Sequence, residues 1–569
     1  LTAMGGRMLK HWLAFPERNL LKIEARLDVV EALTKDDSIQ DKMANHLSEI
    51  VDIERIVAKI ATQKISPRAL VQLGKSLDQI TEIKVDLLDH TSTKLKTLGG
   101  GFLDAMEVIK LIKSTLKSEA PVLLGKGEVI ADGVNVELDE LRQLLHSGKE
   151  HLDSMLERES ERTQIPSLKI AFNNVFGYYI EVRNTHREKV PEDWIRKQTL
   201  VSAERYITEE LKEYEIKILG AEEKIKSLES RLYFELLIEL QKYLELLKTN
   251  AQQVARLDVM WCFAFLALKH KYSRPHFFDT PLLEIKEGRH PVIEHQLPPG
   301  TPFIANDLIL DPLSQQIIMI TGPNMSGKSA ILRQTALLVL MAQMGSFVPA
   351  VAMKTGVIDK IFTRVGASDN ISMGESTFMV EMNETASILN NITENSLVLL
   401  DEIGRGTSTY DGISIAWAIA EYLHEHPAKA KVLFATHYHE LNEMTHDFSR
   451  IKNYNVSVKE LEDKVLFLRK LIPGGSAHSF GIHVAKMAGM PEFVVRRASQ
   501  KLKGLEKSNT LETNTESLKV GKDEMQLSIF NLDDPILESL REEITELDID
   551  KLTPIEALMK LNQIKRQLK

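Results

Sequence analysis

Residues 316–329 read Gln-Ile-Ile-Met-Ile-Thr-Gly-Pro-Asn-Met-Ser-Gly-Lys-Ser, an apolar run that leads into a glycine-bounded loop. The run 317–320 predicts a buried strand, and the apolar spacing after Ser329 predicts a helix. The loop has the form G-x-x-x-x-G-K-S, in which backbone N–H groups and a helix start surround phosphate oxygens. We expect Lys328 to reach the β- and γ-phosphates and the Ser329 hydroxyl to ligate Mg²⁺.

Two further apolar runs end in side chains suited to the same chemistry. The run 396–400 ends in Asp401 and Glu402, and the run 431–436 ends in His437. We expect Asp401 to be the metal-side carboxylate and Glu402 to be the general base for an attacking water. A lone histidine is usually structural, but a place at the end of a third parallel strand favours a role in the site.

Length and composition describe an ordinary multidomain chain. The 569 residues allow three or four domains, 43% are hydrophobic and 27% are charged, and no apolar run approaches a membrane span. The single cysteine, Cys262, excludes an internal disulfide and fits a reducing compartment, so we expect the protein to be cytoplasmic. The net charge of −10 means that any DNA contact must come from a local patch. The chain opens at Leu1 inside a helical pattern, so we expect its natural N-terminus to lie upstream.

The first half of the chain has helical spacing with a β-rich interruption. Near 165–190 the apolar period changes to two, and residues 169–205 hold seven Lys or Arg against five Asp or Glu. Such clusters are more often solvated faces than DNA sites. From Thr199 to about Leu268 there is no proline and only one glycine, and Leu211, Ile218, Ile225 and Leu232 fall seven apart. This pattern predicts one long, coiled-coil-like helix. The candidates for DNA contact are Lys169, Arg183, Arg196 and Lys197.

Residues 372–377 read Ser-Met-Gly-Glu-Ser-Thr and precede a helical pattern. Serine and glycine at a helix start suit an anion site, but they equally suit an ordinary cap made by Ser376 or Thr377. Taken alone, the segment favours the cap.

Four segments together resemble the ABC-type ATPase domain of the MutS DNA mismatch-repair family: 322–329, 372–377, 401–412 and 436–441. The string at 401–412, Asp-Glu-Ile-Gly-Arg-Gly-Thr-Ser-Thr-Tyr-Asp-Gly, is highly specific to that family. The likeness extends through nearly the whole chain, including 1–7, 176–182, 198–206 and 288–292. The resemblance implies a bacterial, nucleoid-associated ATPase that clamps double-stranded DNA and couples ATP hydrolysis to opening and closing.

ATP and Mg²⁺ are the cofactors that the resemblance implies. The residues implied to contact the nucleotide are Phe303, which would stack on adenine, and Gly322, Pro323, Asn324, Met325, Ser326, Gly327, Lys328 and Ser329. Ser329 and Asp401 would hold Mg²⁺, while Lys328, Glu402 and His437 would act in catalysis. Gly374 and Ser376 would serve the nucleotide of a partner subunit, which changes our interpretation of 372–377 from a cap to a functional contact.

The implied fold is multidomain, with an α-helical core and lever, a coiled-coil-like arm, a small β-rich clamp tip, an α/β P-loop ATPase domain and C-terminal helices. The predicted segments are core and lever 1–157, clamp tip 158–212, lever 213–275, ATPase domain 276–480, dimer-interface helix-turn-helix 481–506, linker 507–530 and oligomerisation helices 531–569. Implied partners are a second subunit, with a tetramer as the alternative, and a MutL-type repair protein. The DNA sliding clamp would bind a short peptide made of Gln526, Leu527, Ser528, Ile529 and Phe530.

One expected feature of the family is missing from the sequence. Mismatch-recognising members carry an N-terminal domain with a Phe-x-Glu wedge and then a connector, whereas the nearest match here, at 233–235, has the wrong spacing. We therefore expect no direct mismatch readout and a weakened MutL-type contact. The alternative is a MutS-like protein that acts on recombination or branched DNA. A chromosome-organising ATPase is disfavoured because 43 residues between Lys328 and Ser372 leave no room for its arm. A transporter ATPase is disfavoured because no membrane segment is evident.

Overall fold

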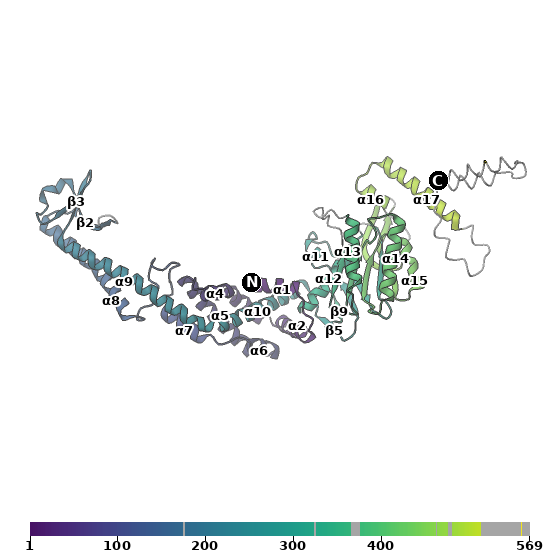
Figure 1. Ribbon diagram of the computed structural model, residues 1–569, viewed down its shortest axis with the longest axis horizontal. Coiled ribbons are helices and arrows are strands. Elements are labelled where there is room, and N and C mark those ends of the chain that lie inside the picture. The colour runs from purple at the N-terminus through teal and green to yellow at the C-terminus, as the bar shows by residue number, and fades with distance from the viewer. Residues whose placement is uncertain are drawn as a thin grey trace, which may run out of the picture. The chain divides into compact units, whose positions relative to one another are not determined.

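A computed structural model describes residues 1–173, 177–323, 326–365, 376–461, 464–475, 481–513 and 559 (Figure 1). The chain divides into two compact units, Leu1–Phe480 and Gly481–Lys569. The predictions for Asn324, Met325, Gly374 and the peptide 526–530 lie outside the described residues. Among the helices that are described, none is both long and apolar enough to cross a membrane.

The first unit begins with a bundle of short helices around one long helix. Its elements are α1 (Ala3–Ala14), α2 (Leu20–Thr34), α3 (Asp37–Ser48), α4 (Ile53–Ala61), α5 (Pro67–Asp89), α6 (Thr93–Gly99), α7 (Met106–Thr115) and α10 (Leu244–His270). Ser66 and Pro67 are residues typical of a helix start, and α5 begins there, with the Ser66 side chain as cap and proline in the first turn. Helix α10 contacts α1, α2, α3 and α4.

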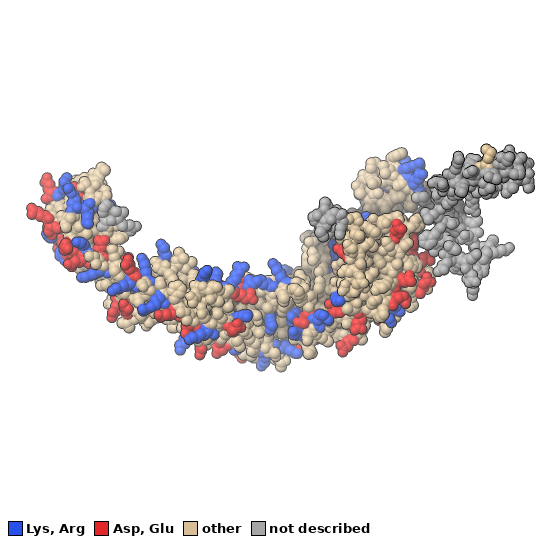
Figure 2. Space-filling view, viewed as in Figure 1, with Lys and Arg blue, Asp and Glu red and all other residues tan. Residues whose placement is uncertain are grey.

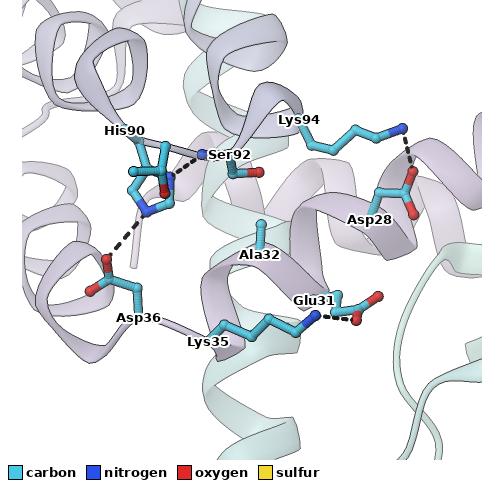
Figure 3. Close-up of a pocket in the computed structure, with 9 residues that line it drawn as sticks. Asp28, Glu31, Ala32, Lys35, Asp36, His90, Ser92 and Lys94 are labelled. Carbon is cyan, nitrogen blue, oxygen red and sulfur yellow. Dashed lines mark hydrogen bonds and ion pairs between the residues drawn. The ribbon is translucent and has the colours of Figure 1, made fainter.

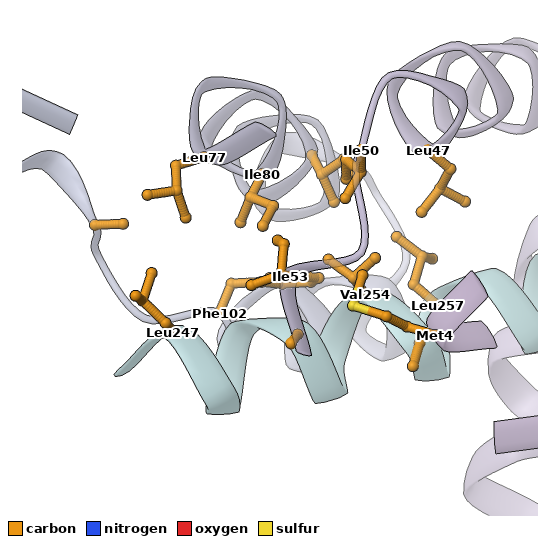
Figure 4. Close-up of a cluster of buried hydrophobic side chains, with 14 of the residues drawn as sticks. Met4, Leu47, Ile50, Ile53, Leu77, Ile80, Phe102, Leu247, Val254 and Leu257 are labelled. Atoms are coloured by element: carbon orange, nitrogen blue, oxygen red, sulfur yellow. The ribbon is translucent and has the colours of Figure 1, made fainter. Parts of the chain in front are cut away.

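An apolar core joins these helices across large distances in sequence. Figure 4 shows Met4, Ile53 and Phe102 pointing toward Leu247 and Val254 of α10, and all five side chains are almost completely buried. Burying side chains of this size is the main favourable contribution to folding. Residues from both ends of the segment 1–270 therefore contribute to the same core.

A pair of long helices with a small sheet extends from this bundle. They are α8 (Val136–Thr163) and α9 (Glu209–Leu240), and between them in sequence lie β1 (Lys169–Asn173), β2 (Gly177–Arg183), the 3-10 turn η1 (Asn184–Lys189), β3 (Ile195–Thr199) and β4 (Ala203–Ile207). The strands pair antiparallel in the order β1-β2-β4-β3. A small separate core that includes Met155, Ile180 and Leu211 packs the sheet onto both helices.

The prediction of a single helix from Thr199 to Leu268 is wrong in two places. The segment after Thr199 turns back as β4, which pairs antiparallel with both β2 and β3 and is buried at four of its five residues. Thr208 then caps α9, which ends at Leu240, and the 3-10 turn η2 (Gln241–Tyr243) separates it from α10. The tip is consequently a complete four-stranded sheet.

The second part of the first unit is an α/β region with two sheets. Its strands are β5 (Pro275–Phe277), β6 (Leu283–Gly288), β7 (Asn306–Leu310), β8 (Ile317–Thr321), β9 (Ala352–Thr355), β10 (Ile361–Arg364), β11 (Leu397–Asp401), β12 (Lys431–Ala435), β13 (Ile451–Leu461) and β14 (Lys464–Pro473). Its helices are α11 (Ile293–Gln296), α12 (Lys328–Met344), α13 (Thr377–Leu389), α14 (Thr409–Glu425), the 3-10 turn η4 (His439–Glu443) and α15 (Met444–Asp447). The sheets have the orders β10-β11-β12-β8-β13-β14 and β5-β9-β6-β7.

Helices cover both faces of the six-stranded sheet. Strand β8 is buried along its whole length, and its alternate residues enter two different cores. Ile318 and Ile320 pack with α12, whereas Ile317 and Met319 pack with α13 and α14. This two-sided burial explains why the strand reads as an unbroken apolar run.

Charged side chains attach the helical bundle to the α/β region. Arg274, just before β5, lies 2.6 Å from Glu24 and 2.8 Å from Asp28 and also pairs with Glu31, three carboxylates on one face of α2. Figure 3 shows two of these acids, Asp28 and Glu31, also bonded to lysines beside a cavity of about 360 Å³. Helix α12 joins the same contact, because Arg26 of α2 donates to the Met344 carbonyl at 3.1 Å.

The described part of the second unit consists of two helices in contact, α16 (Gly481–Met487) and α17 (Glu492–Thr513). The predicted helix pair is confirmed, and Gly489, with φ +84°, provides the left-handed turn between the helices. Helix α17 continues to Thr513, so the start of the predicted linker is helical. Extension costs little there because residues 507–513 contain neither glycine nor proline.

A buried lysine at the start of β12 gives a testable effect on stability. Lys431 is 2% exposed, and burial lowers its pKa from 10.5 to about 8, against the opposing charges of Asp359 and Glu394. Between those values the unfolded chain binds a proton that the folded chain releases, so stability rises with pH across this window. We expect Lys431→Met to stabilise the protein at pH 7 by up to about 3 kcal/mol, at roughly 1.4 kcal/mol per pKa unit.

Denaturant unfolding at pH 7 and at pH 10 checks this expectation, with the exposed Lys452→Met as the control. The advantage of Lys431→Met should shrink at pH 10. An equal advantage at both values would show that packing, and not the buried charge, is responsible.

Candidate functional site

The three sequence runs singled out above end at one edge of the six-stranded sheet. Strands β11, β12 and β8 are neighbours and parallel, and their registers place Asp401 beside Ala435 and Ala435 beside Ile320. The residues that follow each strand therefore meet at the carboxyl edge, where open α/β sheets bind ligands.

The loop after β8 folds around its own lysine. Lys328 is 4% exposed, and its ammonium donates to the carbonyls of Gly322 at 2.6 Å and Pro323 at 3.1 Å. Gly322 and Gly327 have φ values of +140° and +108°, which glycine adopts without strain. Burial lowers the pKa of Lys328 to about 8, partly offset by the charges of Glu402 and Asp401. An anion in this loop would restore favourable pairing to a buried cation.

Ser329 and Asp401 form a fitting start for a Mg²⁺ site. Burial raises the pKa of Asp401, and a hydrogen bond from the Ser329 hydroxyl opposes that rise. Among the described residues, the buried Asp401 Oδ1 has no hydrogen-bond partner, and no cluster of three His, Cys, Asp or Glu side chains could hold a metal. A hydroxyl and a single carboxylate suit Mg²⁺, which takes its remaining ligands from phosphate and water.

Glu402 is held on both carboxylate oxygens. One hydrogen bond joins His437 Nε2 to Oε1, and Arg405 Nη1 donates to Oε2 at 2.6 Å. These contacts, His437 first, lower the pKa of Glu402 to about 2. Its φ of +55° is unusual for a residue with a side chain. The carboxylate is therefore ionised, and Arg405 occupies one of the acceptor positions of Oε2.

A pocket of about 440 Å³ opens beside these carboxylates. Residues that sequence reasoning missed contribute much of its wall: Arg333, Arg364, Glu381 and Arg405. Arg405 lies inside the string 401–412, which is a signal that could have found it. Glu381 and Arg364 are only 6% and 5% exposed, and no local pattern announces that they meet.

The remaining predicted nucleotide contacts are less closely grouped. Ser376 is the N-cap of α13 and accepts from the Met379 N–H at 3.2 Å, which is the capping geometry that its sequence favours. Phe303 is half-buried in the segment before β7. That segment is held to β14, because Lys470 donates to the Ala305 carbonyl at 2.7 Å. The role of Phe303 stays a prediction.

The four candidates for DNA contact are all exposed on the small sheet. Arg196 pairs at 3.3 Å with the buried Glu204, whereas Lys169, Arg183 and Lys197 have no ion pair within the described part of the chain. Lys197 lies at an irregularity in the pairing of β3 with β4. Figure 2 shows basic and acidic side chains mixed over this tip. The positive charge of the tip is thus local and modest.

Comparisons with known proteins match almost the whole chain. The family model for MutS domain III matches residues 1–264, and the model for MutS domain V matches residues 318–506. Proteins named DNA mismatch repair protein MutS from Flavobacterium johnsoniae and Christiangramia forsetii are each 62% identical over all of this chain and 65% of their own length. One from Porphyromonas gingivalis is 54% identical over 100% of this chain and 67% of its own.

The chain thus spans about two thirds of the length of these curated relatives. Two family models cover separate parts of it, and the identity exceeds one half along its full length. The chain belongs to the MutS family.

Proposed function

We propose that this chain is the ATP-hydrolysing, DNA-clamping part of a DNA mismatch-repair protein. One observation carries the proposal: Lys328, Ser329, Asp401, Glu402 and His437 meet at the carboxyl edge of three adjacent parallel strands. Each has the chemistry that phosphoryl transfer to water needs. The names of the relatives favour mismatch repair over action on recombination DNA.

Most of the groups that the proposed hydrolysis needs come from within one chain. Lys328 exchanges its bonds to Gly322 and Pro323 for the β- and γ-phosphates of ATP. Ser329 and Asp401 would hold Mg²⁺, which would neutralise phosphate charge. Arg405 releases Glu402, and this carboxylate takes a proton from water as the water oxygen attacks the γ-phosphorus. The electron pair of the broken bond leaves with ADP, and His437 keeps Glu402 oriented.

The clamp and its partners follow from the family. The helices α8 and α9 would act as the lever and the sheet β1–β4 as the DNA grip. Ser376 would face the nucleotide of a second subunit, which makes a homodimer the smallest active form. The same proposal includes a tetramer as the alternative assembly, and contacts with a MutL-type protein and with the sliding clamp.

Neutralising the exposed lysines of the tip should weaken DNA binding in a salt-dependent way. We expect the double variant Lys169→Gln, Lys197→Gln to make the negative slope of log affinity against log salt shallower by about 2. Each phosphate contact contributes about 0.9 to the magnitude of that slope. These residues are preferable to Arg196, which also pairs with the buried Glu204 and so has a second, structural contact. Fluorescence titration with paired duplex at several salt concentrations measures the slope.

The control is Lys242→Gln with Lys248→Gln, which removes the same charge from exposed positions at η2 and α10. An unchanged slope in the tip variant, or an equal change in the control, would exclude the tip as the DNA grip. Adding single-mismatch and four-way-junction duplexes to the series distinguishes the repair role from a recombination role, which predicts a preference for junctions.

A further inference from the structure

The loop that follows Glu402 is held at Gly404 from both sides. The Gly404 N–H donates to Glu381 Oε1 at 2.6 Å, and its carbonyl accepts from the Tyr438 hydroxyl at 2.9 Å. Gly404 has φ +87°, and a Cβ there would lie 2.6 Å from the Gly412 carbonyl oxygen. The Gly404 peptide is thus held by hydrogen bonds to α13 and to the segment after β12.

Glu381 is fixed in this position by burial and by an ion pair. Its side chain is 6% exposed, and its second oxygen lies 3.4 Å from Nη2 of Arg364 on β10. Arg364 is itself 5% exposed and also pairs with Glu384 at 3.1 Å. A buried carboxylate with both oxygens engaged resists displacement, because any other arrangement leaves a charge unpaired.

The same helix packs against the loop a second time. A Cβ at Gly406 would lie 3.0 Å from the Phe378 Cβ, so α13 and the loop are in close contact there. On the other side, Tyr438 follows His437, which bonds Glu402. Glu402 itself is anchored to the sheet by its N–H, which donates to the Ala435 carbonyl at 2.9 Å. The loop between Glu402 and Gly406 is therefore suspended between β12 and α13.

We propose that Glu381 is a positioning residue that ties the Glu402 loop to helix α13, so that the position of α13 sets the position of the Glu402 carboxylate. The inference rests on the proposed ATP hydrolysis and adds a specific route of control to it. Helix α13 is capped by Ser376, the residue proposed to face the partner subunit's nucleotide. One buried side chain thereby links the two nucleotide sites of a dimer.

Substitutions at Glu381 separate this role from a structural one. Glu381→Gln keeps an oxygen that accepts from Gly404, Glu381→Met removes it at similar size, and Glu381→Asp keeps the charge but is too short to reach. Glu384→Gln, at the exposed neighbour on the same helix, is the matched control. The measurements are kcat and KM for ATP in the full chain with duplex DNA, together with thermal unfolding.

We expect Glu381→Met and Glu381→Asp each to lower kcat by about 10- to 100-fold, with KM little changed. Small misplacements of catalytic groups have effects of this size. Glu381→Gln should retain most of the activity, and Glu384→Gln should resemble the wild type. If Glu381→Met does not fold, Glu381→Asp decides the question. The inference would be overturned if folded Glu381→Met or Glu381→Asp kept the wild-type kcat, or if Glu381→Gln lost as much activity as they do. No hydrolysis by the wild type would instead refute the proposed function.

Discussion

Replacing Glu402 with Gln is expected to lower kcat for ATP hydrolysis by at least about 100-fold, because a positioned general base contributes roughly 10² to 10⁴. The amide has the size of the carboxylate and keeps one oxygen, which can accept the hydrogen bond that Arg405 donates. It cannot accept the proton of the attacking water. ATP binding should remain, since Lys328 and Ser329 are unchanged.

Single-turnover hydrolysis and equilibrium ATP binding, measured on the same preparation, test this expectation. Glu421→Gln, an exposed acid on α14, controls for the loss of one negative charge. A Glu402→Gln variant that keeps more than about a tenth of the wild-type rate would mean that another group removes the proton.

Removing Arg142 should destabilise the base of the long helix pair by about 3–5 kcal/mol, the usual result of leaving a buried charge without its partner. Arg142 of α8 is 7% exposed and lies 2.6 Å from Glu229 of α9, which is 2% exposed. The same guanidinium donates to the Ile130 carbonyl at 2.9 Å, and Glu229 also accepts from the Val129 N–H. Arg142→Met would leave Glu229 buried and charged.

Urea unfolding of two further variants shows whether the stranded charge is the cause. Arg142→Met with Glu229→Gln removes both charges and keeps an acceptor for Val129, so it should recover much of the loss. Arg158→Met breaks an exposed pair with Glu210 between the same two helices and should cost under about 1 kcal/mol. If the double variant is as unstable as the single one, packing accounts for the effect.

The sequence predicts the parts of this protein that depend on local pattern. The runs 317–320, 396–400 and 431–435 are strands because parallel strands buried on both faces are continuously apolar. Helix α5 begins where Ser66 and Pro67 predict it. The meeting of Lys328 with Asp401 and Glu402 follows from the parallel order of strands, which such runs lead one to expect.

Features set by tertiary contact were not predictable in this way. No proline interrupts Thr199–Ile207, which favours continuing the helix, yet pairing with β2 makes part of that segment a strand. Glu381 occupies an ordinary helical position in the sequence, where a glutamate is usually solvated. Only the fold brings it to the Gly404 N–H and so connects it with Glu402.

The restraint on Glu402 is also a property of the folded chain. Arg405 lies three residues after Glu402, but their bond depends on the turn that the positive φ of Glu402 and Gly404 creates. Arg405 is 70% exposed at its side chain, so it can leave the carboxylate without disturbing a core. Its release offers a step at which a partner subunit or DNA could change the rate.

The most direct test of the central claim is phosphate release from ATP by this chain in the presence of Mg²⁺, with and without duplex DNA, beside the Lys328→Met variant. We predict hydrolysis whose rate changes when DNA is added and a near-complete loss of hydrolysis in Lys328→Met. A folded wild-type chain that releases no phosphate under any of these conditions, or a Lys328→Met variant as active as the wild type, would contradict the account.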